Sequence, residues 1–242
     1  MGILQLGHIG FNRSFGPPPG PSPILWNRLE GESGGVITSN VGPDLLAYPT
    51  PGGGSFSSGH YGNALNLTGP GTGVQIPGSL WSDTEGCIEW WAYYTSGQYY
   101  GRLLNADIWN GSGPRIFFYG ASELGIGFQP MANGAYTYNY SVATGQDDKL
   151  NIPLNQWNHI AFSWKRVAGG DADRVWGALN GVVVEFPAPV AGFKFAWDTP
   201  STWPYFGVGY IDAGWAYGPE GQIDNIKMWD YAKLDFSDRN TE

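Results

Sequence analysis

Cysteine is almost missing from this chain, because Cys87 is the only one among its 242 residues. A single cysteine excludes a disulfide within the chain. No His or Lys stands near Cys87 in the sequence to stabilise a thiolate. We therefore predict a buried thiol that behaves as a small apolar side chain.

Basic residues are also scarce, with 12 Lys and Arg against 21 Asp and Glu, for a formal net charge of −9. The densest basic spot is the pair Lys165 and Arg166. Nucleic-acid binding depends on basic side chains that neutralise phosphates, so we predict no nucleic-acid partner. The charged fraction of 14% is too low for a disordered main body.

Long apolar runs are absent, and none approaches the roughly 20 residues of a transmembrane helix. Residues 1–14 lack the basic and apolar regions of a signal peptide, so we predict neither a membrane span nor a leader. No apolar helical periodicity continues beyond about three turns. Long helices are therefore not expected.

Turn formers and aromatic residues are abundant instead, with 38 Gly, 18 Pro, 12 Trp, 14 Tyr and 12 Phe. Glycine and proline at this frequency predict many turns, and the aromatic residues supply a large core. The length suits one large all-β domain or two small ones.

The clearest strand signals lie between residues 153 and 184. Residues 157–164 are aromatic, β-branched or small, which is typical of a strand. The strand that begins at Arg174 is interrupted by Asn180-Gly181, a dipeptide that favours a two-residue turn with positive φ at both positions. The segment therefore predicts two linked hairpins.

About a dozen short strands without βαβ alternation predict an all-β, two-sheet antiparallel jelly-roll sandwich. Residues 62–67 and 73–77 are interpreted as a hairpin, and residues 31–59 as a surface loop with residues 45–48 held down. Residues 86–94 are apolar on both faces, as in a central strand between two layers. The predicted parts are an extended Gly/Pro-rich arm (1–23), the jelly roll (24–234) and a polar tail (235–242).

Four pieces of the chain resemble, in the right order, the LamG-like domains of the concanavalin A-like lectin/glucanase superfamily. They are residues 62–67 with 73–77, residues 88–92 (Ile-Glu-Trp-Trp-Ala), residues 156–161 (Gln-Trp-Asn-His-Ile-Ala) with Leu-Asn-Gly at 179–181, and residues 221–229 (Gly-Gln-Ile-Asp-Asn-Ile-Lys-Met-Trp). The resemblance covers about residues 24 to 234. It implies the concanavalin A-like jelly roll.

Four polar or aromatic residues in these motifs are interpreted as structural. We expect Trp91 and Trp157 to pack in the core, because buried aromatic side chains contribute large apolar areas. Asp224 is expected to satisfy backbone donors in a buried turn rather than to hold a metal. His159, in the middle of a strand, is expected to be a hydrogen-bonded structural residue.

The sequence contains no catalytic set, so we predict no enzyme and no catalytic residues. Retaining glycosidases need two carboxylates about 5 Å apart, and the superfamily supplies them from one strand as E-x-D-x-x-E, which is absent here. The serine motif G-x-S-x-G is absent too. A glycoside hydrolase is therefore disfavoured.

Sugar binding needs an exposed aromatic platform beside polar side chains. The predicted glycan-binding residues, all in segments expected to be loops, are Asp107, Trp109, Trp197, Trp203, Asp212, Trp215 and Tyr217. A protein–protein interface is enriched in the same aromatic types, so that alternative stays open. No cofactor is required; Ca²⁺ is left open, with Asp147-Asp148 and Asp171-Ala-Asp173 as candidate acidic turns.

The N-terminal arm combines apolar residues separated by glycines with the polyproline-like spacer at 16–23. Its predicted partner-binding residues are Ile3, Leu4, Leu6, Ile9, Phe11 and Phe15. We interpret the chain as a non-catalytic structural or adhesion module of a larger assembly, such as a virion decoration, fibre or tail protein or a surface layer. The arm would dock on a neighbouring subunit, which predicts a homo-oligomer or larger assembly at an extracellular or virion surface. The alternative is a stand-alone carbohydrate-binding lectin.

Overall fold

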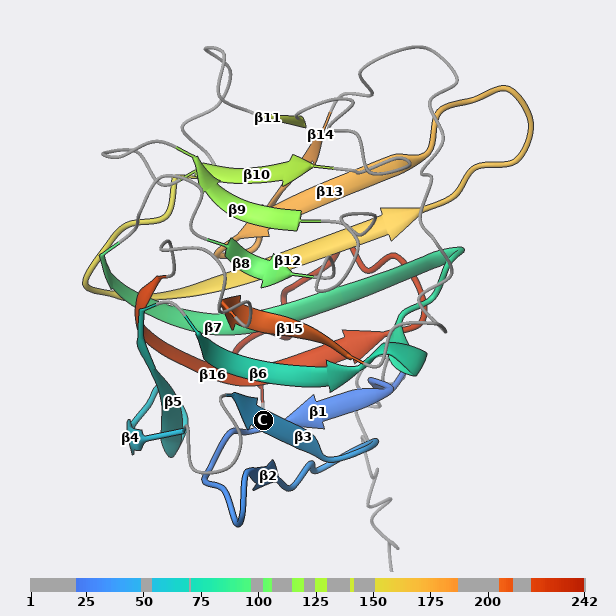
Figure 1. Cartoon of the computed structure of the whole chain (residues 1–242). Helices are drawn as coiled ribbons and strands as arrows, with labels where there is room; N and C mark the ends of the chain where they lie inside the picture. The colour runs from blue at the N-terminus through green and yellow to red at the C-terminus, as the bar shows by residue number, and fades with distance from the viewer. Residues whose placement is uncertain are drawn as a thin grey trace, which may run out of the picture.

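The computed structural model describes residues 21–48, 54–69, 71–96, 102–105, 115–119, 125–129, 140–141, 151–186, 205–210 and 219–241. In these residues the chain forms two antiparallel sheets that pack face to face, which confirms the predicted all-β sandwich (Figure 1). The described residues contain no helix that is long and apolar enough to cross a membrane.

The first sheet, called sheet A, has the order β14-β13-β12-β7-β16-β5-β4, and β1 also pairs with β16. Its strands are β1 (Leu25–Asn27), β4 (Phe56–Ser58), β5 (Asn63–Thr68), β7 (Glu85–Ser96), β12 (Trp157–Lys165), β13 (Arg174–Leu179), β14 (Val182–Phe186) and β16 (Glu220–Trp229).

The second sheet, called sheet B, has the order β11-β10-β9-β8-β15-β6-β3-β2. Its strands are β2 (Val36–Ile37), β3 (Leu45–Tyr48), β6 (Thr72–Pro77), β8 (Arg102–Asn105), β9 (Arg115–Tyr119), β10 (Gly125–Gln129), β11 (Tyr140–Ser141) and β15 (Tyr205–Tyr210). A short 3₁₀ turn, η1 (Gly78–Leu80), follows β6.

The two hairpins predicted around Asn180-Gly181 are confirmed. β12 pairs with β13 and β13 pairs with β14, both antiparallel. Asn180 and Gly181 have φ of 52° and 87°, as the two-residue turn requires. The expected order of β8, β9 and β10 as a meander also holds.

The predicted hairpin between residues 62–67 and 73–77 is wrong. β5 pairs with β4 and β16 in sheet A, whereas β6 pairs with β3 and β15 in sheet B. Both strands bury apolar side chains in the same core, so their patterns resemble those of a hairpin even though the chain changes sheets between them. The predicted surface loop at 31–59 likewise contains β2, β3 and β4.

The core lies between the sheets and is dominated by large aromatic side chains. Trp90 and Trp164 are fully buried, and the Trp81 and Trp164 rings stack with centroids 4.1 Å apart. A Cβ on Gly86 would lie 2.4 Å from the Trp164 ring, so only glycine at this position leaves room for the stacked pair. The close packing of the indoles therefore depends on a missing side chain in β7.

β7 is the central strand that its apolar pattern predicted. It pairs with β12 on one side and with β16 on the other. Trp90 and Ala92 point into the core between the sheets, whereas Cys87 packs against Phe236 in a second buried cluster on the opposite face of sheet A. The thiol of Cys87 is buried, as predicted, and burial raises its pKa well above the usual range.

Candidate functional site

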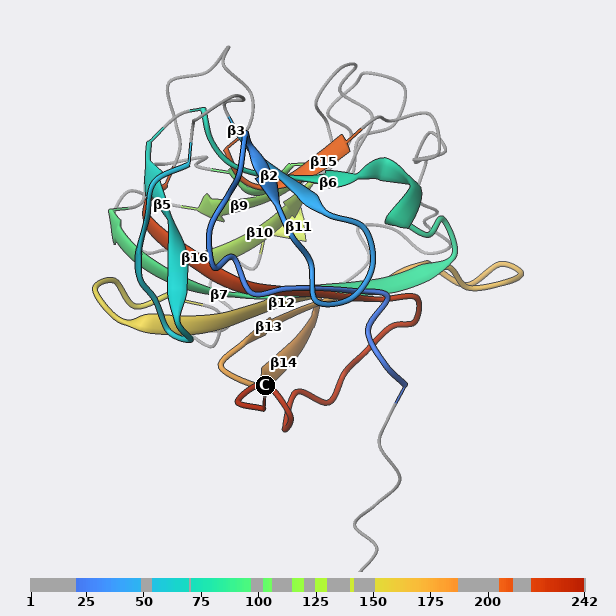
Figure 2. The ribbon, with the colours of Figure 1, turned by 90° about the horizontal axis from the view of Figure 1, so that it is seen from below.

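The outer face of sheet A, which points away from sheet B, carries the polar and aromatic groups that the core excludes. Its central part is covered by residues 231–241, here called the C-terminal strap, which crosses beneath β12 and β13 in the view from below (Figure 2). One end of the same face, near Trp157 and Tyr93, is only partly buried. We describe the covered part first, because it shows which groups remain available to a ligand.

Apolar packing and backbone contacts hold the strap on the sheet. Phe236 is 3% exposed and packs with Cys87, Ala161, Ala178 and Trp229. Ser163 Oγ donates a hydrogen bond to the Lys233 carbonyl at 2.5 Å, and Trp91 Nε1 donates one to the Arg239 carbonyl at 3.3 Å. A segment predicted from its composition as a polar tail therefore has a firm attachment up to Arg239, although the domain boundary at residue 234 stays a prediction.

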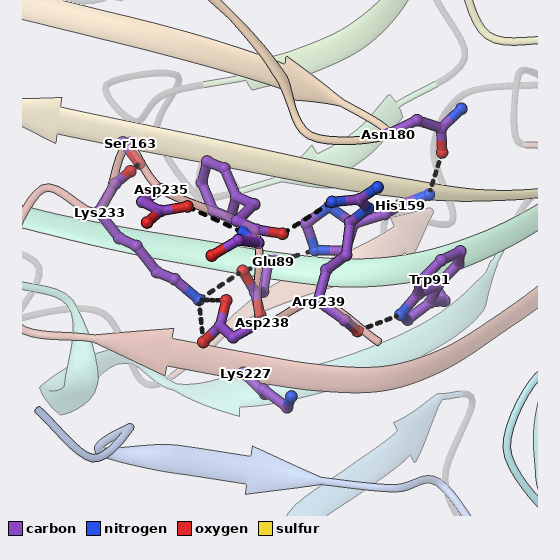
Figure 3. A network of polar contacts seen from close by, with 12 residues as sticks. Glu89, Trp91, His159, Ser163, Asn180, Lys227, Lys233, Asp235, Asp238 and Arg239 are labelled. Carbon is purple, nitrogen blue, oxygen red and sulfur yellow. Dashed lines mark hydrogen bonds and ion pairs between the residues drawn. The ribbon is translucent and has the colours of Figure 1, made fainter. Parts of the chain in front are cut away.

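A buried ionic network lies between the strap and the sheet (Figure 3). Lys233 Nζ lies 3.3 Å from Glu89 Oε2 and 2.9 Å from Asp238 Oδ1, and it stands 3.8 Å from the centroid of Trp229. Burial alone would lower the pKa of Lys233, but the Glu89 and Asp238 carboxylates outweigh it and raise this pKa.

His159 completes this network, with Nε2 at 3.4 Å from Glu89 Oε2. His159 and Glu89 are 1% and 2% exposed, so neither can meet a substrate from solvent. The arrangement therefore holds the strap in place, and the interpretation of His159 as a structural residue is confirmed.

A tight turn between β4 and β5 closes over the next part of the face. Its residues His60 and Tyr61 lie against Trp91, with the His60 ring stacked on the indole at a centroid distance of 3.8 Å. Asp224 Oδ2 accepts a hydrogen bond from the Tyr61 backbone N–H at 2.8 Å. Burial raises the pKa of Asp224 to about 7, although backbone donors, including Tyr61, oppose the shift. Asp224 thus satisfies backbone donors in a buried turn, as predicted.

Beyond this turn, five side chains form a row across β12, β7, β16, β5 and β4. Trp157 lies opposite Tyr93, Tyr93 opposite Gln222, and Gln222 opposite Asn66. Directly opposed residues of an antiparallel pair lie on one face. Ser57 of β4 joins the row through its hydrogen bonds to the two amides. We call this row the transverse strip; Ser57 is exposed and the other four side chains are partly exposed.

The strip is aromatic at one end and polar at the other. The Tyr93 and Trp157 rings have centroids 5.8 Å apart. Gln222 Nε2 donates to Asn66 Oδ1 at 3.0 Å and to Ser57 Oγ at 2.6 Å. Within the described part of the chain, Gln222 Oε1 accepts no hydrogen bond. The strip can therefore stack against a ring and exchange hydrogen bonds with hydroxyl groups, and its residue types include none that titrates near neutral pH.

The expectation that Trp91 and Trp157 pack in the core is wrong for both. Side chains alternate between the two faces of a strand, so the core receives Trp90 of β7 and Trp164 of β12. Trp91 is buried on the outer face beneath His60. Trp157 is partly exposed at the end of the strip. A sequence in which both faces of a strand are apolar does not show which tryptophan points inward.

The seven predicted glycan-binding residues, Asp107, Trp109, Trp197, Trp203, Asp212, Trp215 and Tyr217, lie outside the described residues. The same holds for the arm residues Ile3, Leu4, Leu6, Ile9, Phe11 and Phe15 and for Asp147-Asp148. Both sets stay predictions. Sequence reasoning did not find Tyr93, Asn66, Gln222 and Ser57; only the strand register brings them together.

Asp171 and Asp173, the other acidic pair considered for Ca²⁺, have different surroundings. Asp173 is 3% exposed and accepts a hydrogen bond from the Val167 backbone N–H at 2.9 Å, whereas Asp171 is exposed. Over the ranges that the structure describes, no group of three or more His, Cys, Asp or Glu side chains is arranged to hold a metal ion.

No protein-family model matches the chain, and no curated protein matches its sequence. Solved structures with the same fold include domain 4 of AbnA, an extracellular GH43 arabinanase of Geobacillus stearothermophilus in complex with arabinotriose. It has a TM-score of 0.58 and 18% identity, over 87% of this chain and 93% of that one.

Two further structures resemble the chain over part of their length. The receptor-binding domain of botulinum neurotoxin type G has a TM-score of 0.56 and 12% identity, over 88% of this chain and 49% of that one. Trypanosoma rangeli sialidase in complex with 2,3-difluorosialic acid has a TM-score of 0.58 and 11% identity, over 92% of this chain and 34% of that one. At these identities the likeness shows a shared fold alone, the lectin-like jelly-roll β-sandwich.

Proposed function

We propose that this chain is a non-catalytic carbohydrate-binding module whose transverse strip binds an uncharged glycan. The observation that carries the proposal is the juxtaposition of the Trp157–Tyr93 pair with Gln222, Asn66 and Ser57 on one open face. The apolar face of a sugar ring packs on an aromatic side chain, and its hydroxyl groups exchange hydrogen bonds with amides and hydroxyls. The strip offers both kinds of contact side by side.

The shape of the strip favours an extended ligand. It crosses five neighbouring strands, so at about 4.8 Å per strand its ends are about 19 Å apart. An oligosaccharide of several rings fits such a length better than a single sugar. The complex of the similar arabinanase domain with arabinotriose is a property of that protein, and it supports the choice of a neutral oligosaccharide as the first probe.

The test is calorimetric titration of the full chain with neutral oligosaccharides selected on a glycan array, arabinotriose among them. We expect Trp157→Ala and Gln222→Ala each to weaken binding about tenfold or more, a change of about 1.4 kcal/mol in binding free energy. Trp26→Ala is the matched control, because Trp26 is also a partly exposed tryptophan on the outer face of sheet A. This control should bind as the unmodified chain does.

Equal affinity of the Trp157→Ala, Gln222→Ala and unmodified chains would rule out the strip as the binding site. Loss of binding in Trp109→Ala or Trp197→Ala instead would locate the site in the segments predicted from the sequence. Failure of the unmodified chain to bind any glycan on the array would refute the carbohydrate-binding function itself.

The second proposal is that the module is carried by a larger assembly, such as a virion decoration, fibre or tail protein or a surface layer. The supporting observation is in the sequence: apolar residues such as Leu6, Phe11 and Phe15 precede the proline-rich spacer at 16–23. A segment this rich in glycine and proline has no core of its own and gains order by docking on another subunit. The two proposals are compatible, because a mounted module can also bind glycans.

A further inference from the structure

One lateral edge of sheet A is formed by β14, the strand Val182–Phe186. Among the described residues β13 is its single neighbouring strand, and the five paired positions run without a bulge. Natural edge strands are usually protected by lysine, proline, a bulge or an inward-pointing charge. The Val-Val-Val-Glu-Phe sequence of β14 contains no lysine or proline, so this edge lacks those protections.

The turn before β14 determines which backbone groups point outward. In the Asn180-Gly181 turn, Leu179 and Val182 are the flanking pair, which exchanges the hydrogen bond that closes a two-residue turn. Bonded and non-bonded positions alternate along an antiparallel pair. Val182, Val184 and Phe186 therefore bond to β13, whereas the N–H and C=O groups of Val183 and Glu185 point to the free edge.

The side chains of β14 also suit pairing with another strand. Val182 is 48% exposed, the most exposed large apolar side chain that the structure describes. The charge of Glu185 is compensated within the sheet, because Arg174 Nε donates to Glu185 Oε1 at 2.7 Å and Arg174 Nη2 contacts Oε2. The Arg174 guanidinium lowers the pKa of Glu185, so the charge pair persists at neutral pH.

We propose that β14 pairs antiparallel with β14 of a second copy of this chain, about a two-fold axis at Val184. In that register Val183 of each protomer lies opposite Glu185 of the other. All four outward N–H and C=O groups of each protomer are then hydrogen-bonded, and the two Glu185 side chains do not face each other. The strand is self-complementary, which is what a two-fold interface requires and why a second copy is the expected occupant.

The two-fold axis stands perpendicular to the sheet, because directly opposed residues of an antiparallel pair lie on the same face. The outer faces of both copies of sheet A therefore point the same way and form one continuous surface. Resting here on the proposed function, this places two transverse strips on the same side of the dimer. A surface coated with glycan would then be held by both, with higher avidity than a free oligosaccharide.

The first experiment measures the mass of the full chain by sedimentation velocity over a range of concentrations. A single strand pair is a small interface, so we expect a dimer of about twice the 26.3 kDa chain mass, with a dissociation constant on the order of micromolar. Val183→Pro removes an N–H that points outward and keeps the bonds to β13, and it should give monomers. Val183→Thr keeps the N–H and should still form dimers. A monomeric unmodified chain, or equal dimerisation of the two variants, would overturn the proposal.

A cross-linking experiment tests the register without relying on the proline variant. Val184→Cys places the new thiols opposite each other across the axis and should form a disulfide-linked dimer on mild oxidation. Val182→Cys is the matched control, because its partner in this register is Phe186 and its own copy is about 14 Å away. The native Cys87 is fully buried and should not react. Equal cross-linking of the two variants would contradict the register. Both readouts are masses, so they can fail whether or not the chain binds a glycan.

Discussion

Asp224 connects the interior of sheet A with the turn that borders the strip. It is fully buried in β16, next to a bulge at which Asn225 has a φ of 51°. One carboxylate oxygen holds the Tyr61 N–H, whereas Oδ1 is buried without a hydrogen-bond partner among the described residues. This half-satisfied position explains why burial dominates and the pKa rises to about 7.

The raised pKa of Asp224 predicts a pH dependence of stability. The folded chain keeps a proton that the unfolded chain releases, so the free energy of unfolding falls as the pH rises from about 4 to about 7. Asp224→Asn keeps an acceptor for Tyr61 and removes the titration. Relative to the unmodified chain, this variant should therefore gain on the order of 2 kcal/mol between pH 5 and pH 8. Urea unfolding of both chains at the two pH values measures the difference; parallel curves would show that Asp224 does not titrate in this range.

The C-terminal strap is held by an element-sized set of contacts in which one lysine serves two carboxylates. Lys233 is 5% exposed and Glu89 is 2% exposed. A buried ion pair contributes little net stability, but loss of one partner leaves a buried charge without compensation. The strap therefore depends on Lys233 more strongly than its net electrostatic contribution suggests.

Lys233→Met should destabilise the chain by about 3 to 5 kcal/mol, because the Glu89 carboxylate stays buried and loses its ammonium partner. The double variant Glu89→Gln with Lys233→Met should recover most of this loss, since the uncompensated charge is removed. Chemical unfolding at pH 7 measures both, and hydrogen exchange of the strap amides shows where the loss occurs. A double variant as unstable as the single one would show that the charge is not the cause.

At the scale of the whole molecule, two sheets divide the work of folding and recognition. The face between them is filled by aromatic and aliphatic side chains, and the opposite face of sheet A holds both the covered ionic network and the strip. A transverse row across five strands is a property of the assembled sheet, because its residues lie up to 165 positions apart in the sequence.

The proposed role of the N-terminal arm predicts a difference between the free and the assembled chain. Amides of residues 1–20 should exchange rapidly in the free chain and about a hundredfold more slowly in the native particle. Removal of these residues should leave thermal unfolding and glycan binding unchanged, because the jelly roll begins after the arm. Hydrogen exchange with mass spectrometry measures the protection; equally rapid exchange in both states would refute docking by the arm.

Much of the fold follows from short-range patterns. Asn180-Gly181 specifies the turn between β13 and β14, and the apolar residues on both faces of β7 mark a strand between two layers. The pairing of β5 with β16 rather than with β6 could not be read in the same way. Both alternatives bury the same side chains, and the choice depends on strands more than 150 residues away.

The sequence by itself determined the all-β class, the tight turn at Asn180-Gly181 and the backbone-capping role of Asp224, because each depends on local composition or on a few adjacent residues. The tertiary structure alone decided that Trp90 points inward and Trp157 outward, that the strap covers the ionic network, and that Trp157, Tyr93, Gln222, Asn66 and Ser57 form one row. Those facts depend on strand register. A shift of one residue would turn every side chain of a strand to the other face, and only the packed core holds the register in place.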